Sequence, residues 1–308
     1  MKPLSNATLE KPVTLPKSAI GLETQAALWA FLGVLSFSLT LPMTRIAAPL
    51  MGGFTVGIGR AILAAALAGL VLYIRRERLP ERKHWLGLAL VALGCVFVFP
   101  VLSSLALQFV DSSHGSVFNG LLPAATALVA VLLTKERPHW TFWIVCAAGV
   151  LAAVLYGISR GAGQLQLGDL LMLAAVCAGA IGYVEGGRLA REMEGWRVIS
   201  WALVLSLPVL IAVFPVALSS HSFTPTPMAW LAFMYVGAFS MFLGFFAWYK
   251  GLAMGSIAKT GQVQLVQTPL TLLWSGLLLG EYLDPITLAA GGFMVFIALL
   301  SRFTRVAK

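Results

Sequence analysis

Long apolar stretches alternate with short polar ones along almost the whole chain. Each apolar run is close to the roughly 20 residues that a helix needs to cross a bilayer. Ten such runs cover residues 26–46, 53–74, 84–107, 114–134, 139–158, 169–189, 197–218, 228–250, 258–280 and 285–303. The longest connector between them is the glycine-rich segment 159–169, SRGAGQLQLGD. We therefore expect no extramembrane domain, and we place the function within the helix bundle.

The composition supports a membrane location. Of the 308 residues, 59% are hydrophobic and only 11% are charged, and the mean hydropathy is +0.89. Soluble domains contain about a quarter charged residues, so the sequence predicts an all-α integral membrane protein. Cys95, Cys146 and Cys177 all lie within apolar runs, where cysteine usually behaves as a small hydrophobic residue. We expect no disulfide, no metal site and no cofactor.

The positions of the charges predict the orientation. If the N-terminus is cytoplasmic, the cytoplasmic segments hold eighteen of the 21 Lys and Arg residues, including RRERLPERK at 75–83. The other side keeps only Arg45, Arg60 and Arg160. Cytoplasmic loops retain basic residues, so the net charge of +9 indicates orientation and not nucleic-acid binding. Residues 1–24 lack the apolar core of a signal peptide and are expected to form a cytoplasmic tail. The prediction is a multi-pass protein of a bacterial inner membrane, surrounded by lipid, with both termini in the cytoplasm.

The two halves of the chain share weak sequence similarity. A shift of 146 residues lays HGSVFNGLLPAATAL (114–128) on TGQVQLVQTPLTLLW (260–274) and aligns Pro123 with Pro269. A shift of 143 lays TRIA (44–47) on GRLA (187–190). We interpret residues 25–158 and 169–305 as two five-helix repeats joined by an external linker, 159–168. Because five is odd, the second repeat must be inverted, an architecture typical of alternating-access transporters that hold substrate near the membrane midplane.

The chain resembles the drug/metabolite transporter superfamily, specifically its EamA-type exporters. The shared features are ten helices in two inverted copies, both ends in the cytoplasm, and a proline-bearing fourth helix in each copy followed by the short charged turn KERP or GEYLDP. The resemblance covers residues 25–305, and within the family the chain looks closest to the YddG exporters of aromatic and other neutral amino acids. It implies a basket of helices around a central cavity.

The ninth run carries a polar stripe. At 100° per residue, one face of GQVQLVQTPLTLLWSG (261–276) collects amide, hydroxyl and indole groups. Such a stripe faces either a partner helix or a watered cavity, and both interhelical hydrogen bonding and substrate binding are consistent with it. From this face we select Gln264, Gln267, Thr271 and Trp274 as candidate substrate-binding residues.

Among the prolines within the apolar runs, three lie at corresponding depths in the copied segments. A helix proline leaves the carbonyl four residues earlier without its partner, so Pro42, Pro123 and Pro269 would free acceptors at mid-membrane depth, including the carbonyl of Asn119. They are candidate hinges, and the alternative is a packed kink. Asn119 is a candidate substrate-binding residue.

Aromatic residues complete the predicted site. The eighth run carries Tyr235, Phe239 and Phe242 along one narrow face, which could be an apolar wall for substrate or ordinary packing. Phe37 and Thr40 on the first run and Tyr183 on the sixth are further candidates for lining the cavity.

Charges within the runs are few. We expect Arg45 and Arg60, near external helix ends, to extend toward water, and Glu185 to pair with Arg188 on its own helix. His114 belongs to the external turn DSSH. Since no carboxylate lies at mid-depth, a lipophilic-cation pump and a buried proton relay are both disfavoured.

The sequence therefore predicts a secondary transporter, a monomer or weak dimer, that exports small zwitterionic metabolites, principally aromatic and other neutral amino acids. Phosphorylated or nucleotide-linked sugars and drugs are alternative cargoes on the same fold. Sugar anions would call for inward-facing basic residues, whereas nearly all basic residues fall in cytoplasmic loops. An intramembrane enzyme or a receptor is the alternative from another class, but no histidine pairs with a buried nucleophile, so we expect no enzyme.

Overall fold

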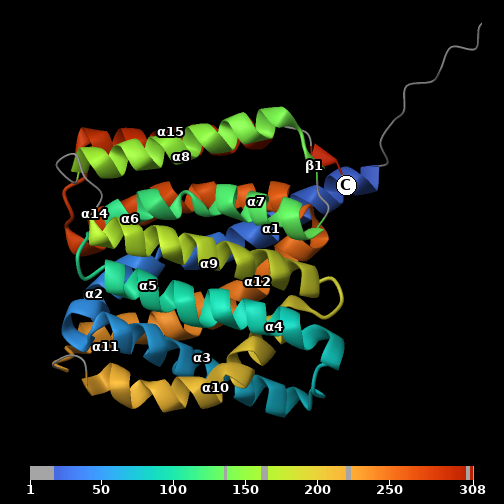
Figure 1. Ribbon diagram of the computed structural model, residues 1–308, viewed down its shortest axis with the longest axis vertical. Coiled ribbons are helices and arrows are strands. Elements are labelled where there is room, and N and C mark those ends of the chain that lie inside the picture. Colours follow the sequence, from blue (N-terminus) through green and yellow to red (C-terminus); the bar gives the residue numbers. More distant parts are fainter. Residues whose placement is uncertain (1–16, 135–136, 161–165, 220–222, 303–305, 308) are drawn as a thin grey trace, which may run out of the picture.

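The computed structural model describes residues 17–134, 137–160, 166–219, 223–302 and 306–307, and these residues are almost entirely helical. The helices lie side by side with roughly parallel axes, so the bundle has two ends (Figure 1). The end that carries the basic loop 75–83 is called the near end, and the opposite one the far end. Of the predicted tail and linker, residues 1–16 and 161–165 lie outside the described part.

The helices follow the predicted apolar runs, although several are interrupted. In chain order they are α1 (Lys17–Ser38), α2 (Thr40–Met51), α3 (Gly53–Arg75), η1 (Arg82–His84), α4 (Trp85–Val91), η2 (Ala92–Val98), α5 (Phe99–Ala106), α6 (Ser112–Asn119), α7 (Leu122–Thr134), α8 (Trp140–Arg160), α9 (Leu167–Leu189), α10 (Gly195–Ser219), α11 (Pro227–Tyr235), η3 (Val236–Leu243), α12 (Gly244–Met254), α13 (Ile257–Gly261), η4 (Gln262–Val266), α14 (Gln267–Leu279) and α15 (Pro285–Arg302). Two short strands, β1 (Arg137–Pro138) and β2 (Val306–Ala307), pair antiparallel.

Within the described residues, seven helical stretches are long and apolar enough to cross a membrane. They are Gly21–Met51, Gly53–Arg75, Arg82–Ala106, Ser112–Leu133, Leu167–Leu189, Gly195–Ser219 and Pro227–Met254. The three remaining predicted runs correspond to α8, to the α13–η4–α14 segment and to α15.

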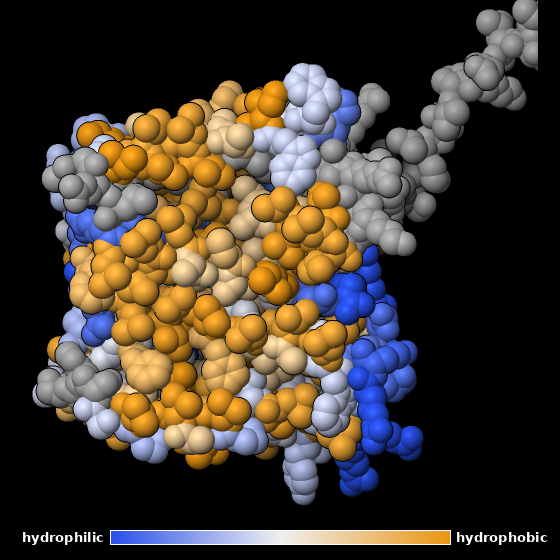
Figure 2. Space-filling model, in the orientation of Figure 1, coloured by the Kyte–Doolittle hydropathy of each residue, from blue (hydrophilic) through white to orange (hydrophobic). Residues whose placement is uncertain are grey.

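Large apolar side chains face outward along the middle of the bundle. Leu132 and Leu277, for example, are 73% and 67% exposed. Figure 2 shows this surface as a broad orange area, with the hydrophilic residues gathered toward the two ends and most densely at the near end, on the right. An apolar surface of this extent suits the hydrocarbon core of a membrane.

Helices from the first and second halves of the chain pack against each other in opposite directions. α6 packs on α14 and α7 on α13, so these two interrupted helices run antiparallel. The hydroxyl oxygens of Tyr156, near the end of α8, and Thr287, near the start of α15, are 2.9 Å apart. Thr55, near the start of α3, donates to the carbonyl of Ala217, near the end of α10, at 2.8 Å. Each pair therefore joins one helix of the first half to one of the second.

Small residues allow the closest helix contacts. A Cβ added to Gly251 on α12 would lie 2.6 Å from the backbone nitrogen of Ala30 on α1, and one added to Gly33 would lie 2.9 Å from the Cβ of Trp248. These distances leave no room for a side chain, so the two backbones can approach this closely only at glycine.

Each of the three predicted hinge prolines follows an interruption of its helix. Pro42 is the third residue of α2, after the turn at Leu39, and Pro123 is the second residue of α7. Pro269 is the third residue of α14 and follows the 3₁₀ segment η4. A proline in the first turn of a helix lacks only an N–H that would be unpaired there anyway. The expected breaks are present, whereas hinge motion at them stays a prediction.

Two π-helical segments occupy corresponding places in the two halves. η2 interrupts the third predicted run and η3 interrupts the eighth. A π-helix has more residues per turn than an α-helix, so side chains beyond it point in directions that a projection at 100° per residue does not predict. This shift decides which aromatic residues reach the interior.

Candidate functional site

A cavity lies between the two halves at the level of the helix breaks. It is lined by side chains from α1, α2, α3, η2, α5, α6, α9, η3, α12 and α14. The lining residues are Phe37, Thr40, Leu41, Arg60, Cys95, Phe99, Pro100, Asn119, Tyr183, Ser240, Met241, Phe245 and Gln267. Both halves contribute, as expected for a site shared by two repeats.

The cavity is narrow in this conformation. About 470 Å³ between its walls is free of protein atoms, but only about 30 Å³ can hold the centre of a water molecule. One water needs about 10–15 Å³ by this second measure, so the space suits a few waters. Ligand sites for small molecules usually measure ~300–1,000 Å³, far more than the 30 Å³ that is open to water centres here. The walls of the cavity would therefore have to separate to admit a substrate.

An aromatic cluster forms one wall. The rings of Phe37 and Tyr183 are stacked, with centroids 6.3 Å apart and an interplanar angle of 16°. Phe245 packs against both, at 5.1 Å from Phe37 and 5.9 Å from Tyr183. Trp248, fully buried behind them, lies 5.1 Å from Tyr183. This arrangement offers flat apolar faces next to polar groups on the opposite elements.

Five of the eleven predicted substrate-binding residues line the cavity: Phe37, Thr40, Asn119, Tyr183 and Gln267. The other six lie elsewhere, for two different reasons.

The first reason applies to the polar stripe of the ninth helix, most of which binds neighbouring helices. Thr271 donates to the carbonyl of Ser38 at 2.8 Å, and the indole nitrogen of Trp274 donates to the hydroxyl of Ser38 at 3.0 Å. Gln264 does not line the cavity but donates to the side-chain oxygen of Gln267 at 3.3 Å. Interhelical hydrogen bonding therefore accounts for Thr271 and Trp274, and Gln267 is the member of the stripe that reaches the cavity.

The second reason applies to the aromatic face of the eighth helix. The helix is π-helical from Val236 to Leu243, and the predicted face does not stay together. Phe239 is 51% exposed on the outer surface, where it stacks on Tyr235 at 5.4 Å. Phe242 is buried against Phe246 outside the cavity. The structure thus replaces the predicted Tyr235, Phe239 and Phe242 wall with Phe245.

Arg60 is the charged lining residue that sequence reasoning missed. We expected its guanidinium to extend toward water, but it is 2% exposed and lines the cavity. Its Nη1 lies 3.5 Å from the hydroxyl of Thr44 and its Nη2 lies 3.2 Å from the hydroxyl of Ser103. The expectation failed because Arg60 is seven residues into α3, two turns below the helix start, and its face is turned toward α5. Its depth in the second apolar run was the available signal.

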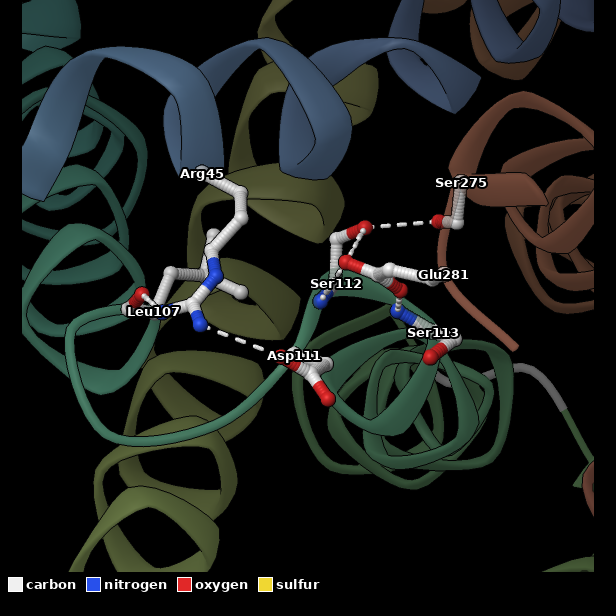
Figure 3. Close-up of polar contacts among 7 residues, drawn as sticks. All are labelled: Arg45, Leu107, Asp111, Ser112, Ser113, Ser275 and Glu281. Atoms are coloured by element: carbon white, nitrogen blue, oxygen red, sulfur yellow. Dashed lines mark hydrogen bonds and ion pairs between the residues drawn. The ribbon is translucent and has the colours of Figure 1, made fainter. Parts of the chain in front are cut away.

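A polar network joins α2, α5, α6 and α14 at the far end (Figure 3). Glu281 accepts from the backbone nitrogens of Ser112 and Ser113 at 3.0 and 2.9 Å, and also from the hydroxyl of Ser112 at 3.0 Å. These are the first N–H groups of α6, where a helix carries partial positive charge. Arg45 pairs with Asp111 at 3.1 Å and donates to the carbonyl of Leu107 at 2.5 Å. We call these residues the far-end network.

The near end is also held by polar contacts and contains a groove. Lys259 and Glu23 form an ion pair at 3.1 Å, and Arg191 donates to the carbonyl of Gly255 at 3.0 Å. Between α1 and the α13–η4 segment lies a groove of about 550 Å³.

Also at the near end, on the loop after α9, a hydrogen bond between His84 and the Glu192 carboxylate at 3.0 Å lowers the pKa of Glu192.

Two further charged pairs lie outside the cavity. Arg188 binds Glu185 at 2.9 Å, so the expected intrahelical pair is present. His114 is buried and lies 2.5 Å from Asp169, which is also buried. The prediction that His114 belongs to an external turn was therefore wrong. His114 is buried because α6 begins at Ser112, so His114 already faces α9.

Within the described residues, no group of three or more His, Cys, Asp or Glu side chains could hold a metal ion.

Comparison with known proteins gives consistent matches over both halves. The profile of the EamA-like transporter family matches residues 24–158 and again residues 166–303. The uncharacterized transporter YdeK of Bacillus subtilis (strain 168) is 44% identical over 82% of this chain and 88% of its own length.

More distant relatives have named cargoes. A probable terminal-alkyne amino-acid exporter of Streptantibioticus cattleyicolor is 22% identical over 88% of this chain and 91% of its own. An S-adenosylmethionine/S-adenosylhomocysteine transporter of Chlamydia trachomatis is 26% identical over 86% of this chain and 84% of its own. A protein of known crystal structure superposes with a TM-score of 0.68 at 17% identity, over 90% of this chain and 96% of that one, which is a likeness of fold alone.

Proposed function

Because the chain belongs to the EamA-like transporter family, we propose that it exports small zwitterionic metabolites, principally aromatic and other neutral amino acids, by alternating access. The carrier lies in a bacterial inner membrane with both termini in the cytoplasm. This orientation makes the near end cytoplasmic, since the loop 75–83 carries the densest basic charge.

The observation that carries the proposal is an aromatic and polar cavity between two halves whose equivalent helices run antiparallel. We assign residues 25–158 and 169–305 to two five-helix inverted repeats. In such proteins, one repeat rocks against the other about a site between them. The breaks before Pro42, Pro123 and Pro269 lie beside the cavity, where hinges would change its width.

The two ends of the bundle support a cycle of access. In this conformation the far-end network holds α6 against α14 and α2 against the α5–α6 turn. Loading from the cytoplasm would require the near-end contacts between α1 and α13 to part, and release would require the far-end network to break. Such a cycle would alternate between opening at the near end and opening at the far end.

The cargoes in the names of the distant relatives favour an amino-acid head group. An amino acid and S-adenosylmethionine both carry an α-ammonium and an α-carboxylate, while the rest of each molecule differs widely. A cavity that binds the common head group with polar side chains, and the variable part with aromatic rings, would accept such a range.

Uptake into proteoliposomes tests the proposal. The full-length protein, reconstituted and loaded on one side with unlabelled phenylalanine, should exchange it for labelled phenylalanine faster than protein-free liposomes. Other neutral amino acids should compete. If exchange stayed at the protein-free level for every amino acid tried, the proposed cargo would be wrong.

A further inference from the structure

We propose that Arg60 is the anchor for the carboxylate of the transported molecule and that Asn119 accepts its ammonium, so the carrier selects ligands with a carboxylate at one end of an aromatic body. This inference rests on the proposed function and specifies its cargo.

The guanidinium of Arg60 is buried and only partly satisfied. It has five N–H donors, and two of its nitrogens donate to the hydroxyl oxygens of Thr44 and Ser103. Its Nε is buried without a hydrogen-bond partner. In the described part of the chain, no Asp or Glu side chain forms an ion pair with it. A buried charge without a counter-ion is costly, and such residues within membranes usually serve a substrate or ion.

The neighbouring helices hold the guanidinium at the cavity wall. Ser103 donates its own proton to the carbonyl of Pro100 at 3.3 Å, which leaves its oxygen free to accept from Arg60. The close approach of α3 and α5 permits this contact, since a Cβ on Gly57 would lie 2.7 Å from the Cα of Val101. The remaining donors can meet a carboxylate in the cavity, because a guanidinium matches the two oxygens of that group.

Asn119 supplies the complementary acceptor. It is 3% exposed, lines the same cavity, and its side-chain oxygen is buried without a hydrogen-bond partner. A bound ammonium would satisfy this oxygen, while Phe37, Tyr183 and Phe245 would contact the apolar part of the ligand. One unpaired donor group and one unpaired acceptor on the walls of one cavity match the two charges of a zwitterion.

A set of four ligands separates the two anchors. Phenylalanine carries both charges, phenethylamine lacks the carboxylate, 3-phenylpropionate lacks the ammonium, and glucose 6-phosphate tests an unrelated anion. Binding is measured by thermal stabilisation of the purified full-length protein, because a ligand that binds the folded state raises its melting temperature. Phenylalanine should bind most tightly.

Substitutions assign each charge to its residue. Arg60→Gln should weaken the binding of phenylalanine and 3-phenylpropionate about 10- to 100-fold, because a hydrogen bond to a charged group is lost. It should leave the binding of phenethylamine unchanged. Asn119→Leu should weaken the binding of phenylalanine and phenethylamine but not that of 3-phenylpropionate. Arg60→Lys should recover part of the lost affinity. Arg188→Gln removes the same charge from a position on α9 that does not line the cavity, and it should change none of the affinities.

The ligand-free melting temperature separates this role from a structural one. If Arg60 only holds helices together, Arg60→Gln should lower that temperature and weaken every ligand equally, which would overturn the proposal. Equal binding of phenylalanine and phenethylamine by the unaltered protein would overturn it as well. If no amino acid bound but glucose 6-phosphate did, through Arg60, the amino-acid assignment would fail while an anion anchor at Arg60 would stand.

Discussion

At the scale of single residues, the helix break after Ser38 explains why three polar residues of the ninth helix, Gln267, Thr271 and Trp274, face a neighbouring helix. Pro42 has no N–H to offer this carbonyl, and the hydroxyl of Thr271 takes that place at 2.8 Å. Trp274 binds the Ser38 hydroxyl, and Gln267 donates to the neighbouring carbonyl of Phe37 at 3.2 Å. Inside a membrane no water can satisfy a freed carbonyl, so the stripe stabilises the broken helix that it contacts.

Thr271→Val tests this interpretation. The substitution keeps the shape of the side chain but leaves the Ser38 carbonyl without its partner, so unfolding in detergent should require about 1 kcal/mol less free energy. Thr126→Val is the matched control, since the Thr126 hydroxyl is buried without a hydrogen-bond partner and its loss should cost nothing. Equal stability of the two variants would contradict the assignment.

At the scale of elements, the π-helical segment η3 decides which aromatic residues reach the cavity. A continuous α-helix would keep Tyr235, Phe239 and Phe242 on one face, whereas the wider turn places Phe239 on the outer surface and Phe245 in the cavity. In the first half of the chain, the π-helical segment η2 contributes Cys95 to the cavity wall. Backbone irregularities of this kind frequently occur at functional sites.

Paired substitutions at Phe245 and Phe239 test the role of this segment. Phe245→Ala should weaken binding of phenylalanine about tenfold, because an aromatic contact and its buried area are worth roughly 1–2 kcal/mol. Phe239→Ala removes an identical ring from the same helix and should leave binding unchanged, since that ring is half exposed outside the cavity. A larger loss at Phe239 than at Phe245 would show that the predicted face was right.

At the scale of the whole molecule, polar contacts hold both ends of the bundle. The near end has ion pairs such as Arg197 with Glu77 and Lys259 with Glu23, and the far-end network places a carboxylate on the N-terminus of α6. Removing a contact that only one of two states makes shifts the equilibrium toward the other state. The balance between closed and open far ends should therefore depend on Glu281.

Access to Cys95 measures that balance. In a protein with Cys146→Ala and Cys177→Ala, a charged, membrane-impermeant thiol reagent added at the far end should label Cys95 slowly, because this residue is buried in the cavity wall. Glu281→Gln should accelerate labelling several-fold, since it removes the charge that holds α6. Glu192→Gln removes a near-end carboxylate and should have no effect from this side. Unchanged labelling in Glu281→Gln would show that the network does not gate the cavity.

The sequence by itself determined the membrane class, the apolar runs, the breaks beside Pro42, Pro123 and Pro269, and the family, because hydrophobicity and proline act locally along the chain. It also selected Phe37, Thr40, Asn119, Tyr183 and Gln267, which line the cavity. These five residues lie where the helices are regular or are interrupted beside a proline.

Only the tertiary structure decided the rest. Phe239 turned outward because a π-helical segment changes the direction of every following side chain, and no residue type marks such a segment. Thr271 and Trp274 donate hydrogen bonds to Ser38 and do not line the cavity, because the tertiary structure packs the end of α1 against α14. Arg60 turned inward because α5 packs against α3 through glycine, and charge counting by loops cannot show the side to which a helical arginine points.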